Sequence, residues 1–231
     1  MALTSKRRYH APAREAAAAQ TRVAVVRAAK DVFEARGWTA TTMRLIAGAA
    51  GVSTKTVEAI FKTKGALLSA AVTYTFRGAD DERPLMQREA AQAFEAAPDA
   101  PRALRLHAAY ARPITQRSAA IAQVVESAAA GDPGVAETWN TMLDNRRGGA
   151  RWATEVVSTK PGLRRGVHPD EIHTTILLAI DWATYRTLVR ERGLTPEGYE
   201  DWMGTLYARM LVGDRVSRPG RGSSGPGRGP R

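Results

Sequence analysis

Beyond Gly78 in this chain of 231 residues, prolines mark the starts of the apolar stretches. A helix tolerates proline in its first turn because the missing N–H would have no intrahelical partner there. The clearest signals are Asp132-Pro133 and Thr195-Pro196, in which a capping side chain directly precedes the proline. No stretch alternates convincingly enough for a strand. The sequence therefore predicts an all-α fold. The prolines that carry this prediction are Pro84, Pro101, Pro133, Pro169 and Pro196.

The first quarter of the chain predicts shorter helices. Apolar residues recur at helical spacing up to Gly37, which offers a stop signal. Thr42, Ser53 and Thr63 can each cap the helix that follows, and Gly51 permits a tight turn between two of these helices. With caps included, the expected helices cover about 21–36, 42–50, 53–61, 63–74, 84–96, 101–112, 113–130, 134–159, 169–192 and 196–212.

The net charge of +11 is unevenly distributed along the chain. Residues 1–64 hold 12 Lys and Arg against 4 Asp and Glu, whereas residues 65–212 hold 17 against 18. Residues 213–231 hold 5 Lys and Arg against 1 Asp and Glu. They are rich in Gly, Pro, Ser and Arg and have too few apolar side chains to form a core, so we expect a disordered tail there. This distribution is typical of a polyanion-binding unit joined to a neutral unit with another role. A coding bias towards Arg and Ala is the alternative explanation, and it fits the tail better than the neutral middle.

Several classes of protein and site are excluded or disfavoured. The absence of cysteine excludes disulfides, thiolate zinc sites and cysteine nucleophiles, and it fits a cytoplasmic location. The longest uncharged apolar run, 176–180, is too short to span a membrane, and the N-terminus has no secretory signal. His168, Asp170, Glu171 and His173 fit a helix start better than a metal site, because the two histidines are spaced i, i+5. With no catalytic motif present, we expect no enzyme activity, no metal and no cofactor.

The stretch TTMRLIAGAAGVSTKTVEAIFKTK, Thr41–Lys64, has the pattern of a helix-turn-helix. Two short apolar stretches flank a Gly-Val-Ser turn, and the second helix of such a unit enters a DNA major groove. The apolar face is expected to pack on the helix before it, while the polar side chains that open the second helix point outwards. These Ser, Thr and Lys side chains can reach phosphates or base edges. A helical hairpin without a DNA-binding role is the alternative, and the excess of Lys and Arg in residues 1–64 argues against it.

The segment Thr21–Leu68 resembles the DNA-binding region of the TetR family of bacterial transcriptional regulators. The resemblance rests on Ala-Ala-x-x-x-Phe, the glycine after that helix, the threonine before the next, Ile-Ala-x-x-Ala-Gly-Val-Ser, and Phe-x-x-Lys-x-x-Leu. It implies an all-helical homodimer that binds a palindromic operator, with a C-terminal domain whose small-molecule effector alters the spacing of the two DNA-reading heads. The contacts that it implies are with phosphate at Thr42 and Lys64, and with DNA at Arg44, Ser53, Thr54, Lys55 and Thr56.

Glu58 departs from the family pattern, which commonly has a tyrosine that contacts the DNA backbone at this position. That contact cannot be carried over. One interpretation is a local ion pair with Lys62 at i+4 or with Lys55 at i−3. The other is that Glu58 accepts a hydrogen bond from a cytosine N4 in the major groove. Both Glu58 and Lys62 are included in the expected DNA-binding surface.

Helices 169–192 and 196–212 have apolar faces that are too wide for a single neighbour. A bundle of four such helices from two chains would cover these faces and would agree with the dimer that the resemblance implies. Burial within one chain is the alternative. The predicted dimer interface comprises Ile176, Ile180, Trp202, Met203, Leu206 and Met210.

Aromatic and Met residues with a few polar groups between 101 and 152 are typical of a small-molecule pocket, and equally of an ordinary helical core. The candidate effector residues are His107, Tyr110, Ile114, Trp139, Met142, Arg146 and Trp152. Asp181 stands among apolar residues and needs a partner. Arg186 and Tyr185 are the local candidates, beside an interface role and a ligand contact.

The sequence thus predicts a DNA-binding transcriptional regulator, most simply a repressor that is a homodimer and is released from a double-stranded operator by a small effector. A regulator of the same fold without a small-molecule ligand, gated by a protein partner or constitutive, is the alternative. A helical enzyme with a basic N-terminal region is a third class, and the absence of a catalytic motif disfavours it. The expected division is a basic flexible arm at 1–20, the DNA-binding domain at 21–66, the effector and dimerisation domain at 67–212, and the tail at 213–231.

Overall fold

The computed structural model describes residues 11–78 and 83–213, and every regular element in those ranges is a helix. The all-α prediction is confirmed. The expectations for residues 1–10 and 214–231 lie outside the described residues. The α-helices are α1 (Ala11–Ala40), α2 (Met43–Ala50), α3 (Thr54–Ile60), α4 (Lys64–Arg77), α5 (Glu89–Glu95), α6 (Ala100–Ala129), α7 (Pro133–Ser158), α8 (Pro169–Ala179), α9 (Trp182–Tyr185) and α10 (Pro196–Leu211).

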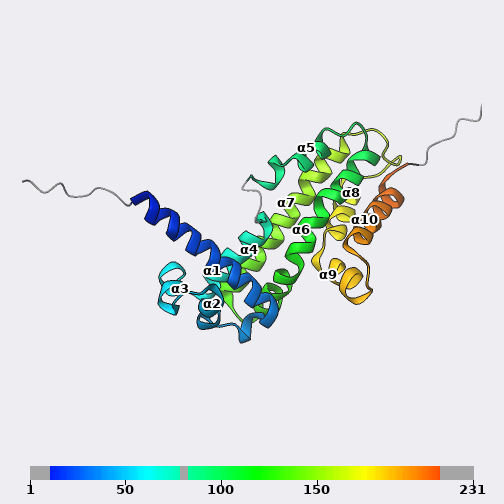
Figure 1. Cartoon of the computed structure of the whole chain (residues 1–231). Helices are drawn as coiled ribbons and strands as arrows, with labels where there is room; N and C mark the ends of the chain where they lie inside the picture. Colours follow the sequence, from blue (N-terminus) through cyan, green and yellow to red (C-terminus); the bar gives the residue numbers. More distant parts are fainter. Residues whose placement is uncertain (1–10, 79–82, 214–231) are drawn as a thin grey trace, which may run out of the picture.

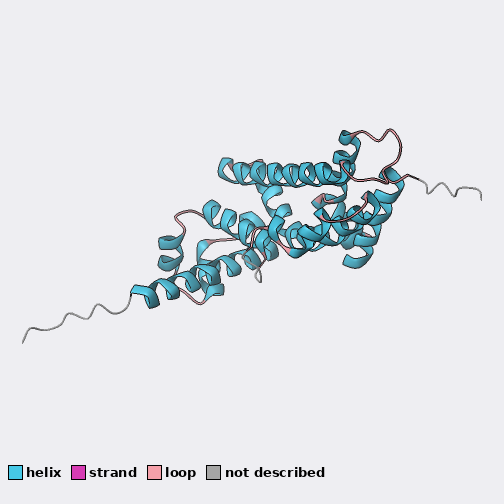
Figure 2. Ribbon diagram, turned by 90° about the horizontal axis from the view of Figure 1, so that it is seen from above, coloured by secondary structure: helices cyan, strands magenta, loops and turns pink. Residues whose placement is uncertain are grey.

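Figure 1 shows α1, α2 and α3 gathered at one end of the molecule, while α8, α9 and α10 lie towards the other end. The long helices α6 and α7 pack against each other between these groups, and α4 joins the first group to them. Because α6 also packs against α1, α4, α5, α9 and α10, it connects the two ends. The view from above in Figure 2 shows the same separation of the two ends.

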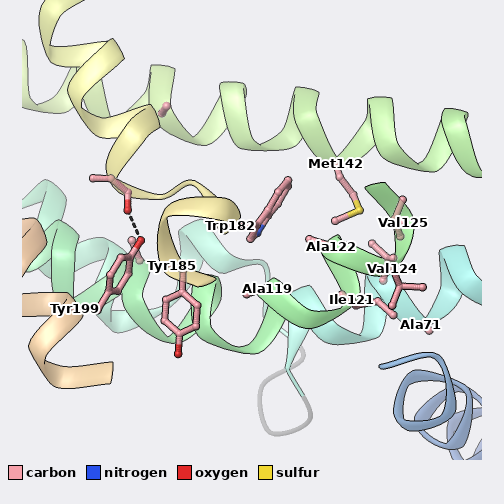
Figure 3. Close-up of a cluster of buried hydrophobic side chains, with 14 of the residues drawn as sticks. Ala71, Ala119, Ile121, Ala122, Val124, Val125, Met142, Trp182, Tyr185 and Tyr199 are labelled. Carbon is pink, nitrogen blue, oxygen red and sulfur yellow. Dashed lines mark hydrogen bonds between the residues drawn. The ribbon is translucent and has the colours of Figure 1, made fainter. Parts of the chain in front are cut away.

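Buried apolar side chains form a continuous core from α1 to α10. At the α1 end, Phe33, Ile46 and Val57 are completely buried, so α2 and α3 share a core with α1 as expected. In the larger half, Met142 and Trp182 are buried among side chains of α6 (Figure 3). Of the helices that the structure describes, none is long and apolar enough to cross a membrane.

Helix α1 begins earlier than the sequence suggested. It starts at Ala11 rather than at Thr21, so the expected flexible arm is helical over its second half. The four consecutive alanines Ala16–Ala19 explain the difference, because alanine has the highest intrinsic helix propensity. At the other end, Gly37 adopts φ +72° and ψ −178° and breaks the helical geometry, which agrees with the predicted stop signal.

Helix α6 is continuous where two helices, 101–112 and 113–130, were expected. Pro113 lies inside α6 and removes one backbone hydrogen bond, a change that costs about 3 kcal/mol in an isolated helix interior. Buried residues on both sides of it, from Leu104 to Val125, hold the two halves of α6 in the core. Tertiary packing therefore offsets the local cost.

The predicted helix 169–192 is interrupted instead of continuous. Helix α8 ends at Ala179, and a carboxylate oxygen of Asp181 accepts the Thr184 N–H over 3.0 Å to start α9. The carbonyl oxygen freed at Ala179 accepts a hydrogen bond from the hydroxyl of Tyr199. After α9 the chain forms a π-helix, Arg186–Glu191, and then reaches α10.

Candidate nucleic-acid interface and effector site

Side-chain caps fix the geometry of α2 and α3. Thr42 Oγ1 accepts the Leu45 N–H over 3.2 Å at the start of α2, and Ser53 Oγ accepts the Thr56 N–H over 3.1 Å at the start of α3. Between the two helices, Gly51 adopts the left-handed conformation at φ +68°. The predicted caps and the glycine turn are confirmed, and the turn joins the C-terminus of α2 to the N-terminus of α3.

The predicted DNA-contacting side chains gather on the outside of this unit. Thr42, Arg44, Ser53, Lys55, Glu58 and Lys62 are exposed, while Thr54, Thr56 and Lys64 are half-buried. Opposite them, Val57 and Phe61 are buried against the core and anchor α3. The outward face of α3 is therefore polar, with Lys55 and Glu58 as its charged residues, and it lies at the end of the molecule in Figure 1.

Lys64 has a role that the sequence did not reveal. Its Nζ donates to the carbonyl oxygen of Trp38 over 2.9 Å and to that of Thr41 over 3.1 Å. Burial lowers the pKa of Lys64. An ammonium group has three donors, so one remains for a phosphate after these two bonds. Lys64 thus ties the start of α4 to the junction of α1 and α2, whatever it contacts in DNA.

Glu58 forms no ion pair with Lys55 or Lys62 in the described part of the chain. Helix α3 ends at Ile60, and Phe61 is extended at φ −131° and ψ 107°. Lys62 is therefore not on a shared helix with Glu58, and the condition for a helical i, i+4 pair is not met. The carboxylate stands exposed on α3.

Three of the predicted effector residues belong to one aromatic cluster with Phe94. His107 and Trp152 pack edge-on against Phe94, with ring centroids 5.4 Å and 5.0 Å away, and Tyr110 lies 5.7 Å from Trp152. His107 Nδ1 lies 3.0 Å from the Tyr207 hydroxyl of α10. Burial lowers the pKa of His107 to about 4, so its ring is neutral near pH 7. Sequence analysis missed Phe94 and Tyr207.

A second group forms around Trp182, which Figure 3 places between α6 and α7. The Trp182 ring lies 5.6 Å from that of Trp139, and the guanidinium carbon of Arg146 lies 4.9 Å from its centre. Arg146 also pairs with Asp181, which corrects the expectation that Arg186 or Tyr185 would be the partner. Arg186 instead pairs with Glu126 of α6 over 3.5 Å. Nε of Arg146 is buried without a hydrogen-bond partner.

Two cavities lie on the described part of the protein near these helices, and Met142 is the one predicted effector residue that lines either of them. Met142 lines the smaller cavity. This smaller cavity, of about 560 Å³, lies between α4 and α7. A larger one, of about 1050 Å³, lies between the start of α6 and α10, away from the predicted residues. Ile114 is half-buried on α6. Five of the seven candidate effector residues therefore lie in two packed clusters rather than in the wall of a single open pocket.

The predicted dimer face is partly internal. Ile176 and Met203 have no exposed surface, because they fill the core between α8, α10 and α6, so they cannot contact a second chain directly. Ile180, Trp202 and Leu206 are half-buried, and Met210 is 43% exposed. Leu178 on α8, which was not predicted, is 58% exposed, the largest exposed fraction among the large hydrophobic residues described.

Comparisons with known proteins agree with this architecture. The sequence pattern of the bacterial regulatory proteins of the tetR family matches residues 25–71. A comparison with curated proteins yields no match.

Solved structures match over most of the chain. A protein from Saccharomonospora viridis in complex with choline is 16% identical with a TM-score of 0.66, covering 84% of this chain and 98% of its own. A transcriptional regulator from Rhodococcus sp. Rha1 is 20% identical with a TM-score of 0.60, covering 82% and 95%. NalD of Pseudomonas aeruginosa, the secondary repressor of a multidrug efflux pump, is 19% identical with a TM-score of 0.57, covering 86% and 98%. At these identities the likeness is one of fold.

Proposed function

We propose that this chain is a repressor of the TetR family, whose pattern residues 25–71 match, and that it binds a palindromic operator as a homodimer and is released by a small-molecule effector. The chain is a DNA-binding transcriptional regulator with a helix-turn-helix. The observation that carries the proposal is the outward face of α3, a polar surface with an exposed lysine, Lys55, on a short helix whose other face is buried in the core. A regulator of chromosomal operators acts in the bacterial cytoplasm.

The start of α3 supplies the proposed base contacts. Ser53 is occupied in capping, while Lys55 is exposed and can donate to guanine O6 and N7 or to a phosphate. Thr42 and Arg44 at the start of α2 stand where the backbone of the same groove would pass, next to helix N–H groups that favour anions. Phosphate contacts set the position of the protein, and α3 reads the sequence.

A dimer would place two α3 helices in successive major grooves, about 34 Å apart along the DNA. Leu178 on α8 and Met210 on α10 supply exposed apolar surface at the end of the molecule opposite α3. Pairing there leaves both reading heads free. We therefore propose that the unit from α1 to the start of α4 reads DNA and that residues 67–212 dimerise and bind the effector.

Effector release requires a ligand that binds the two conformations of the protein with different affinity. Helix α4 is the connection to the reading head, and Arg117 of α6 donates to its last carbonyl oxygens, at Thr75 over 2.9 Å and at Phe76 over 2.6 Å. The Phe76 ring also meets Trp182 edge-on at 6.1 Å. A ligand that opens the cluster around Trp182 would therefore shift the end of α4.

A regulator of the same fold without a small-molecule effector is the second candidate. It is favoured by the packing of the predicted effector residues against one another. In that case a protein partner would gate DNA binding, or binding would be constitutive.

One experiment separates the candidates. Sequences bound by the full chain are selected from a random DNA pool, and the selected duplex is then titrated with choline, which the Saccharomonospora viridis neighbour holds, and with a panel of hydrophobic drugs. Saturable binding to a palindrome supports the regulator, and ligand-dependent release supports the effector. Selection of no sequence would contradict the proposed function itself.

A further inference from the structure

The smaller cavity, of about 560 Å³, lies between the linking helix α4 and the first half of α7. Its size is within the range of about 300–1,000 Å³ that is usual for small-molecule sites. The apolar part of its wall includes Val72 and Phe76 of α4 and Met142 of α7. Val72 and Met142 are buried, and Phe76 is half-buried. We call this space the α4–α7 cavity.

The two helices that enclose the α4–α7 cavity run side by side in the same direction. Arg117 of α6 bonds to the end of α4, at the Thr75 carbonyl oxygen, and α6 then returns towards the start of α4 before α7 begins. At that start, burial lowers the pKa of Lys64 while the charge of nearby Asp132, the N-cap of α7, opposes the shift. One end of the cavity is therefore next to the lysine that fastens α4 to the reading head.

Hydroxyl groups line both sides of the cavity. Those of Thr73, Thr138 and Thr141 donate to carbonyl oxygens of their own helices, over 3.0, 3.4 and 2.9 Å. A hydroxyl has one proton and two lone pairs, so its capacity to accept remains after such a bond. A molecule in the cavity therefore meets hydrogen-bond acceptors on both helices. The hydroxyl residues of the wall are Thr63, Ser69, Thr73, Thr138 and Thr141.

The two charged residues of the wall belong to opposite ends of the cavity. Glu137 is in the first turns of α7, whereas Arg77 is the last residue of α4. Both are exposed, and neither forms an ion pair within the described residues. At 1.5 Å per residue, α7 continues along the cavity for about 12 Å from Glu137 to Asn145. The Glu137 carboxylate is thus available to a cationic donor at the end nearer the reading head.

We propose that the α4–α7 cavity binds a small molecule that carries several hydroxyl groups and one amine, the chemistry of an amino sugar, and that this binding changes the affinity for DNA. The ammonium group pairs with Glu137, the hydroxyl groups donate to the threonine oxygens, and the C–H face of the sugar ring covers Phe76 and Met142. This inference deepens the proposed function, on which its second half rests, because it names the site and the chemical class of the effector.

Such a ligand bonds to α4 and α7 at once and so fixes one helix relative to the other. Lys64 ties the start of α4 to the carbonyl oxygens of Trp38 and Thr41, at the junction of α1 and α2. Fixing α4 therefore also fixes the orientation of the reading head. In a homodimer that orientation sets the spacing of the two α3 helices. We expect DNA affinity to fall by about 5–150-fold, the usual range of coupling between two sites.

The first test measures sugar binding to the full chain by calorimetry, without DNA. The probes are glucosamine, at a pH where its amine is protonated, and glucose, which has a hydroxyl group in place of the amine. Wild type should bind both and should prefer glucosamine. Glu137→Gln should remove this preference. The matched control, Glu155→Gln, changes another exposed glutamate of α7 that lies outside the cavity, and it should keep the preference.

A second variant removes acceptors without changing the shape of the wall. Thr138→Val with Thr141→Val should weaken the binding of both sugars, while circular dichroism shows that the helices are intact. Wild type that binds neither sugar would overturn the proposal. Equal affinities in wild type and both cavity variants would also overturn it, as would a loss of preference in Glu155→Gln.

The last step adds glucosamine to the complex of the full chain with the selected duplex. It should release wild type and should leave Glu137→Gln bound. Sugar binding with no change in DNA affinity would overturn the regulatory half of the proposal. Failure of the proposed function is distinguishable, because the chain would then select no DNA sequence and would still prefer glucosamine in a way that depends on Glu137.

Discussion

The ammonium group of Lys64 donates to the backbone carbonyl oxygen of Trp38 over 2.9 Å and lies 3.9 Å from the centre of the same residue's indole ring. The Trp38 ring in turn stacks on Phe33 in the core of α1, with centroids 5.9 Å apart. One side chain at the start of α4 thus fastens the linking helix to the reading head. This contact is therefore one of the places where α4 and α1 are coupled.

Changing Lys64 to Met keeps most of the apolar stem and removes both hydrogen bonds. We expect the free energy of unfolding to fall by about 1.5–3 kcal/mol, the range for hydrogen bonds to charged groups. Urea unfolding measures this. The control is Lys62→Met, at an exposed position nearby, which should leave stability unchanged. A salt slope for DNA binding that falls by about 0.9 per subunit would add the phosphate contact, and an unchanged slope would remove it.

Changing Glu58 to Gln tests how this exposed carboxylate is used. Because the structure contains no pairing of Glu58 with Lys55 or Lys62, we expect the carboxylate to accept from a cytosine N4. Affinity should fall by about 1–3 kcal/mol on the best operator, with relaxed preference at one symmetric pair of positions. The measurement uses operators varied one base at a time. Uniformly tighter binding on every operator would contradict base reading, since it would report only the loss of a negative charge.

His107 should make stability depend on pH in the acid range. Burial holds its pKa at about 4, below the value of 6.5 expected in the unfolded chain. Between these values the unfolded state binds more protons, so stability is complete above pH 6.5 and falls as pH falls towards 4. The loss attributable to His107 is about 3 kcal/mol.

Denaturant titrations from pH 7 to pH 4 measure this dependence. His107→Gln should flatten it in this range, while Tyr207→Phe removes the hydrogen bond but retains the titrating ring, and so should keep much of it. A wild-type stability that is constant from pH 6.5 to pH 4 would refute the assignment.

The dimer face can be tested with residues that are already exposed in the single chain. Leu178→Glu and Met210→Glu should yield folded monomers, whereas Val23→Glu, at a 53% exposed residue on α1, should remain a dimer. Sedimentation gives the oligomeric state. Affinity for the palindrome should drop by about 10²–10⁴-fold, because the two half-sites are no longer bound together. Dimers of unchanged affinity in both variants would place the interface elsewhere. Leu206→Glu is less decisive, since Leu206 is half-buried and the change could unfold the chain.

The short-range features were predictable because each depends on a few neighbouring residues. Thr42, Ser53 and Thr63 cap as expected, since a side-chain oxygen reaches an N–H only two or three positions away. The break after Ala179 was not predictable, because the Asp181 carboxylate is held by Arg146, which lies 35 residues earlier. Local pattern favoured Arg186 instead.

Tertiary packing explains the remaining differences between the predictions from sequence and the structure. Ile176 and Met203 have the composition of an interface, yet they are buried within one chain, and periodicity does not distinguish these two environments. Phe94 lies in a short alanine-rich helix with no distinctive pattern, so its place in the aromatic cluster depends on the fold. The site residues on α2 and α3 could be named from sequence, whereas the arrangement of the effector region could not.

The bond between His107 and Tyr207 has a consequence for how the protein is made, because it joins residues 100 positions apart. The contact of Lys64 with Trp38 spans only 26. A ribosome delivers the N-terminal part first, so the reading head can close while α10 is still to be synthesised. Until then α6 emerges with its His107 face uncovered and open to chaperones and proteases. A chain that stops before α10 therefore leaves the His107 face of α6 uncovered, and quality control has an apolar surface by which to remove it.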